Sequence, residues 1–167
     1  MRCILGIDPG ISGAIVLHDA TTGETQFYDM PTVSNHRGAG GRSDVDGYAL
    51  GMLVDSLKSQ IKHAFIEQVG GIGKQSAANS FQFGLNTGIV HGILFANLVP
   101  ITLVTPQKWK QFFNLKRGKD QTNAQFKSMS RAKASSIMPA YANQWALAKH
   151  DGRAEALLIA LYGAKHV

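Results

Sequence analysis

The chain has 167 residues, of which 44% are hydrophobic and 17% are charged, and its formal net charge is +6 at pH 7. This composition excludes a disordered chain and is typical of a single globular domain, here expected over residues 1–167. The lone Cys3 excludes a disulfide framework, and no segment has the pattern of a signal peptide or a membrane span, so a cytoplasmic protein is expected.

The apolar pattern predicts three strands in succession, over residues 2–8, 13–19 and 24–30. Residues 31–44 are rich in glycine and have no apolar period, which predicts a loop. The expected elements that follow are a helix over 44–61, a strand over 63–69, a helix over about 76–98, a strand over 101–105, a helix opening at Thr105-Pro106, a helix over about 123–137 and a helix over 151–163. This alternation predicts a mixed α/β architecture.

Four acidic residues occupy positions that are unusual for carboxylates. Asp8 and Glu67 each end an apolar strand, where a carboxylate must be paired, hydrogen-bonded or metal-bound because its desolvation is costly. Asp151 and Glu155 stand four residues apart at the start of an apolar helix, so both project from one face. Strand ends and helix N-termini meet at one edge of an α/β sheet, so the four could converge there. Oxygen donors alone would select Mg²⁺ or Mn²⁺ over zinc.

Each of these acids also has a purely structural interpretation. Asp8 could organise the turn at Pro9-Gly10, and Glu67 could be a hydrogen-bonded strand-end acid. Asp151 could cap the last helix, and Glu155 could be an exposed acid of its first turn.

Basic residues gather between Leu115 and Ser136, where only Asp120 opposes them. Together with the net charge this favours a polyanionic partner such as nucleic acid, and a solvated helix face is the alternative. The residues are Lys116, Arg117, Lys119, Lys127, Arg131 and Lys133.

Gly84, Gly88 and Gly92 recur at every fourth position of the helix predicted over 76–98. They lie on one face and permit close approach of another element. That element is either the domain's own sheet or a second subunit.

Three segments, in this order, resemble the RuvC-type Holliday-junction resolvases, a branch of the ribonuclease-H-like superfamily. They are ILGIDPG at the start, AFIEQV about sixty residues later and RAEALLIALYG near the C-terminus. The resemblance spans nearly the whole chain, and TPQKWKQFF looks more like the phage members. It implies a ribonuclease-H-like α/β fold with a five-stranded mixed sheet flanked by helices.

The resemblance also implies a homodimeric endonuclease that resolves four-way DNA junctions by paired nicks, using two Mg²⁺ ions for which Mn²⁺ can substitute. Asp8, Glu67, Asp151 and Glu155 would be the metal ligands and the catalytic residues. The residues expected to contact backbone phosphates are Lys74, Lys108, Lys110, Lys116, Arg117 and Lys119.

The chain departs from the family pattern in two places. The third ligand usually lies three residues before the last acid, a position that is Gly152 here, so Asp151 or the adjacent His150 would have to replace it. The aromatic residue that often follows IEQV is replaced by Gly70-Gly71. A broader branch- or flap-selective nuclease and a non-catalytic junction-binding protein are the alternative functions.

Overall fold

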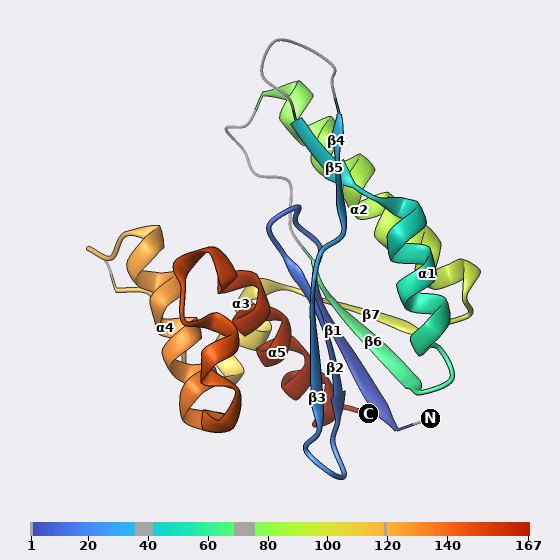
Figure 1. The fold of residues 1–167 in the computed structure, drawn as a ribbon. Coiled ribbons are helices and arrows are strands. Elements are labelled where there is room, and N and C mark those ends of the chain that lie inside the picture. The colour runs from blue at the N-terminus through green and yellow to red at the C-terminus, as the bar shows by residue number, and fades with distance from the viewer. Residues whose placement is uncertain (1, 36–41, 69–75, 119) are drawn as a thin grey trace.

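A five-stranded mixed sheet forms the centre of the computed structural model, which describes residues 2–35, 42–68, 76–118 and 120–167 (Figure 1). The strand order is β3-β2-β1-β6-β7, in which β1, β2 and β3 pair antiparallel whereas β6 and β7 run parallel to β1. The strands are β1 (Cys3–Asp8), β2 (Ala14–Asp19), β3 (Thr25–Asp29), β6 (Ile61–Glu67) and β7 (Ile101–Val104). The five strands expected from the sequence are therefore confirmed.

Helices cover both faces of the sheet (Figure 1). One face carries α1 (Gly47–Leu57) and α2 (Ala77–Ala96). The other carries α3 (Pro106–Phe112), α4 (Asn123–Ile137), α5 (Asp151–Ala164) and two short 3-10 helices, η1 (Pro139–Trp145) and η2 (Ala148–His150). No helix in the described ranges is both long enough and apolar enough to cross a membrane.

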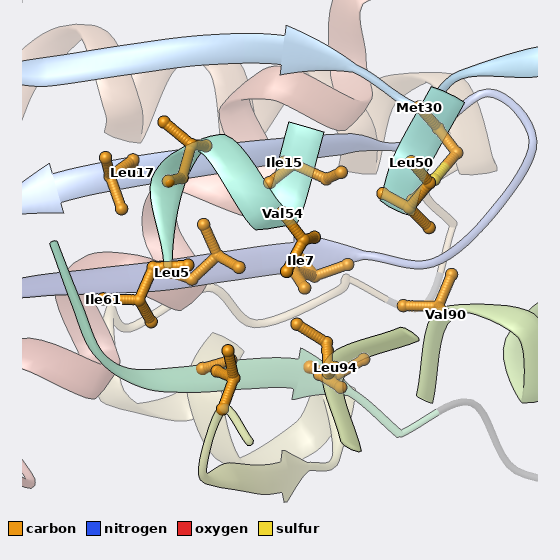
Figure 2. Close-up of a cluster of buried hydrophobic side chains, with 14 of the residues drawn as sticks. Leu5, Ile7, Ile15, Leu17, Met30, Leu50, Val54, Ile61, Val90 and Leu94 are labelled. Carbon is orange, nitrogen blue, oxygen red and sulfur yellow. The ribbon is translucent and has the colours of Figure 1, made fainter. Parts of the chain in front are cut away.

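Two hydrophobic cores form because successive side chains of a strand point to opposite faces of the sheet. Leu5 and Ile7 of β1 lie on the same face as Leu50, Val54 and Leu94 of the covering helices (Figure 2). On the opposite face, the sheet packs against α3, α5 and η1. The sheet contributes Ile4, Val16 and Phe65 to this core, and the helices contribute Trp109, Trp145, Leu157 and Leu158.

Helix α5 packs closely on β1 because glycine occupies position 6. A Cβ atom at Gly6 would lie 2.2 Å from the carbonyl oxygen of Ala156 and 2.5 Å from the backbone nitrogen of Ala160. A Cβ at Gly152 would similarly lie 2.7 Å from the carbonyl oxygen of Ser12. The small residues thus fix how close α5 lies to the sheet.

The loop predicted over residues 31–44 is wrong, because this segment contains an antiparallel hairpin of β4 (Thr32–Asn35) and β5 (Arg42–Val45). The hairpin is anchored by Asn86 of α2, whose buried side-chain oxygen accepts a hydrogen bond of 3.0 Å from the Val45 N–H. A tertiary contact of this kind supplies stability that is absent from the local apolar pattern.

The glycines of α2 do not pack on the domain's own sheet. At Gly84, Gly88 and Gly92 an added Cβ would meet no atom within 4 Å among the described residues. The buried residues of α2 are Asn86, Val90 and Leu94, on the opposite side of the helix. Intramolecular packing of the glycine face is therefore excluded for the described chain.

Gly6→Ala is expected to lower the free energy of unfolding by about 3 kcal/mol or more, because the new methyl group overlaps backbone atoms that cannot move alone. The matched control is Gly51→Ala in α1, where a Cβ meets nothing within 4 Å, and a gain of about 0.5–1 kcal/mol is expected from helix propensity. Urea denaturation of both variants measures the difference. Equal stabilities would contradict the close packing of α5.

Candidate metal and nucleic-acid site

Asp8 and Glu67 lie side by side because of the parallel register of β1 and β6. Ile7 pairs with Ile66, so the next residue of each strand reaches the same edge of the sheet. Ile7 and Ile66 both point into the core beneath α1 and α2, so Asp8 and Glu67 point to the face covered by α3, α4 and α5. The predicted convergence of these two strand-end acids is observed.

Glu155 joins these two acids from the second turn of α5. Glu155 is only 7% exposed, so the interpretation of Glu155 as an exposed first-turn acid is wrong. Burial, followed by repulsion from Glu155, raises the pKa of Asp8 to about 6. Burial, followed by repulsion from Asp8 and then Glu155, raises the pKa of Glu67 to about 7. Three carboxylates thus share one electrostatic environment.

Hydrogen bonds and the cations Lys110 and Lys127 offset part of this repulsion. Trp109 Nε1 donates to Glu67 Oε1 at 2.9 Å, and Ser130 Oγ donates to Glu155 Oε1 at 3.2 Å. The Lys110 ammonium lies 3.8 Å from the same oxygen of Glu155.

Asp8 also organises the turn after β1, because its Oδ1 accepts a hydrogen bond of 3.3 Å from the Gly10 N–H. The structural interpretation of Asp8 therefore holds alongside its place among the acids.

Asp151 faces two cations of α4. Its Oδ1 lies 3.0 Å from Arg131 Nε, without the alignment of a hydrogen bond, and its Oδ2 lies 3.9 Å from Lys127 Nζ. Asp151 is the first residue of α5 and does not cap it, because the N-cap residue is His150. The proposal that Asp151 completes the acid group therefore requires it to leave Arg131 and Lys127.

The position three residues before Glu155 cannot supply a ligand in place of Asp151. That position is Gly152, which is buried and in which any side chain would meet the backbone of Ser12 and Gly13. The neighbouring His150 has a buried Nδ1 atom that makes no hydrogen bond to the described residues. This nitrogen is therefore available to a partner from outside the described residues.

The acids fit a divalent cation in donor type and in charge. Asp8, Glu67 and Glu155 offer only oxygen atoms, and their mutual repulsion would be relieved by a cation between them. As placed, however, no three His, Cys, Asp or Glu side chains within the described ranges are grouped tightly enough to hold a metal ion. Binding would therefore require the carboxylates to move closer together.

The expected phosphate contacts fall in different surroundings. Lys116 is exposed, whereas Arg117 donates from Nε and Nη2 to the carbonyl oxygen of Gln121. Lys108 is exposed and lines a surface pocket with Tyr162 and His166. Lys74 and Lys119 lie outside the described residues, as does the Gly70-Gly71 segment.

Trp109 and Ser130 were not expected among the site residues, and the contacts of Lys127 and Arg131 with Asp151 were not expected either. Lys127 and Arg131 stand four residues apart on α4, so their spacing alone indicates a shared basic face. No sequence pattern identifies Trp109 or Ser130, because their importance comes from contacts with Glu67 and Glu155, 42 and 25 residues away along the chain.

The fold is shared with solved structures of RuvC. A Thermus thermophilus RuvC in complex with a Holliday junction substrate matches with a TM-score of 0.58 at 16% sequence identity, over 96% of this chain and 91% of that chain. A second Thermus thermophilus RuvC structure matches with a TM-score of 0.51 at 16% identity, over 98% and 96% of the two chains. The predicted ribonuclease-H-like fold is thereby confirmed. No protein-family model matches the sequence, and no curated protein matches it significantly.

The raised pKa values of Asp8 and Glu67 make the metal-free protein less stable as the pH rises. The unfolded carboxyls ionise near 3.8 and 4.5, whereas the folded ones ionise near 6 and 7, so their favourable contribution is complete below pH 3.8 and is lost by about pH 7. Between pH 5 and pH 8 in EDTA, wild type should lose about 2 kcal/mol of unfolding free energy relative to Glu67→Gln.

Urea denaturation at the two pH values measures this difference. The control is Asp55→Asn, a change at an exposed carboxylate of α1, which should follow the wild-type pH dependence. If the stability of Glu67→Gln shows the wild-type pH dependence as well, Glu67 is not held among other acids.

Proposed function

We propose that the protein is a divalent-metal-dependent endonuclease that cuts four-way DNA junctions. The observation that supports this most directly is the group formed by Asp8, Glu67 and Glu155 at one edge of a sheet whose fold is that of RuvC. One of the solved structures with this fold is bound to a Holliday junction substrate. Hydrolysis of a phosphodiester requires stabilisation of negative charge, which bound cations provide.

Asp8, Glu67 and Glu155 would hold the metal, and Asp151 is the fourth candidate ligand. The ions expected are two Mg²⁺, for which Mn²⁺ can substitute. When bound, they would activate water and stabilise the leaving oxygen. The chain itself would contribute carboxylate oxygens from two strand ends and one helix, and these side chains would move closer together when the metal binds.

A basic surface next to the acids would bind the DNA backbone. Lys127 and Arg131 lie on α4 beside Asp151, and Lys110 lies beside Glu155. The net charge of +6 favours the binding of a polyanion such as DNA. The affinity for DNA should therefore fall steeply as the salt concentration rises. Lys74, Lys108, Lys116, Arg117 and Lys119 are further candidates for phosphate contacts.

A non-catalytic junction-binding protein is the second candidate. It is favoured by the lack of any side chain at Gly152 and by the absence of a tight metal-binding group within the described chain. It predicts binding of the junction with no nicking in Mg²⁺ or Mn²⁺, so one cleavage assay distinguishes it.

Asp8→Asn should bind a synthetic four-way junction about as tightly as wild type but should cut it at least about 10³-fold more slowly in Mg²⁺, because a ligand of the metal is lost. Asp55→Asn, which removes the same charge from an exposed site, should cut at the wild-type rate. Cleavage by Asp8→Asn at the wild-type rate would refute the metal site. Forks and flaps in the same assay measure how selective the enzyme is for junctions.

Asp151→Asn distinguishes a ligand from an ion-pair partner. Since its carboxylate contacts Arg131 and Lys127, we expect this variant to keep more activity than Asp8→Asn. A loss as large as that of Asp8→Asn would instead place Asp151 among the ligands.

The outer face of α2 would join two copies into a dimer. Three exposed aromatic or aliphatic residues lie on the same face as the glycines at helical spacing: Phe81 (71% exposed), Leu85 (45%) and Phe95 (58%). Open glycines beside large apolar side chains form a surface that a second helix can approach closely. An isologous dimer would match the two-fold pseudosymmetry of a four-way junction.

Leu85→Glu should shift the protein from dimer to monomer, because two charges would face each other across the interface. The control is Leu147→Glu, at an equally large residue that is 55% exposed and lies outside α2. Sedimentation velocity at several protein concentrations measures both. A wild-type protein that stays monomeric at all concentrations, with and without junction DNA, would refute the dimer.

A further inference from the structure

Trp109 stands out among the contacts of the acid group, because it is fully buried and it touches a carboxylate. Its side chain is 0% exposed, and its indole Nε1 donates to Glu67 Oε1 at 2.9 Å. A buried indole N–H needs an acceptor. Here that acceptor is a carboxylate that burial and its acidic neighbours disfavour in the charged form, and the hydrogen bond partly offsets this effect.

The position of Trp109 follows from the way α3 begins. Val104 of β7 pairs with Glu67 of β6, so the two strands end at the same level. Thr105 then caps α3 by accepting from the Lys108 N–H, and Pro106 occupies the first turn. The indole is thereby held beside the end of β6 by a sharp, well-defined connection.

The face of the same ring carries the neighbouring cation. Lys110 Nζ lies 4.8 Å from the Trp109 ring centroid and 5.1 Å from that of Phe126, and it also lies 3.8 Å from Glu155 Oε1. Cation–π contacts of this kind hold an ammonium group without neutralising it. Trp109 therefore touches both Glu67, through its edge, and the counterion of Glu155, through its face.

We infer that Trp109 is a positioning residue for metal binding, an inference that depends on the proposed metal-dependent function. The indole N–H holds Glu67 by Oε1 in one orientation, which would leave Oε2 to bind a cation. Partners of this type, which orient a ligand without touching the metal, commonly contribute 10–100-fold to metal affinity.

The chain contains its own control. It has two tryptophans, and Trp145 is also buried, at 2% exposed, with Nε1 donating to Ser135 Oγ at 2.8 Å. Trp109→Phe and Trp145→Phe each remove one buried indole N–H and leave a similar small void. Only the first removes a hydrogen bond to a carboxylate.

Calorimetric titration with Mn²⁺ at pH 8, without DNA, tests the inference on the full chain. Trp109→Phe should bind Mn²⁺ about tenfold more weakly than wild type, whereas Trp145→Phe should bind as wild type does. Both variants should bind the junction in EDTA with wild-type affinity. Equal Mn²⁺ affinity in Trp109→Phe and wild type would overturn the role of Trp109 and leave the proposed function intact. No Mn²⁺ binding by wild type would refute the metal site itself, and the inference with it.

Fluorescence provides a second test that does not depend on the folding of Trp109→Phe. In Trp145→Phe, Trp109 is the sole tryptophan, and paramagnetic Mn²⁺ bound at Glu67 should quench its emission with the midpoint found by calorimetry. Calorimetric binding without any change in Trp109 emission would place the metal elsewhere and overturn the inference.

Discussion

The close packing of α5 against β1 is the constraint on which the site depends. Gly6 allows the backbone of Ala156 to approach β1 to a distance that any Cβ would prevent. Glu155 directly precedes Ala156, so the same approach brings its carboxylate to the end of β1, where Asp8 lies. A glycine in the middle of a strand thus determines the distance between two acids that are far apart in sequence.

That packing has an electrostatic consequence. Asp8, Glu67 and Glu155 are brought together in a partly buried place, and this burial, followed by their mutual repulsion, raises the pKa of Asp8 and Glu67. The surroundings offset the repulsion only in part, through the Trp109 N–H and the Lys110 ammonium. A cation bound between these carboxylates would relieve the remaining repulsion, which is the electrostatic basis of the proposed metal site.

The order of strands and helices could be predicted from local patterns, because each element of the central sheet is a short apolar run between turn residues. The β4–β5 hairpin could not be predicted in this way, since it depends on a hydrogen bond with Asn86 of α2, a later helix. Likewise Asp8 and Glu67 could be found because they interrupt apolar strands. The ion-pair partners of Asp151 could not be predicted. Arg131 lies on α4, and the local sequence of α4 does not determine how this helix packs against α5.

The proposed metal site and the proposed dimer interface lie on different sides of the sheet. The three carboxylates come from β1, β6 and α5, and none comes from α2. A dimer formed through the outer face of α2 would therefore leave each copy with its own complete set of acids. The two sites would not share residues, so the symmetry of the junction, and not a shared active site, would have to coordinate the two nicks. The core between the sheet and helices α1 and α2 would separate the dimer interface from the acids.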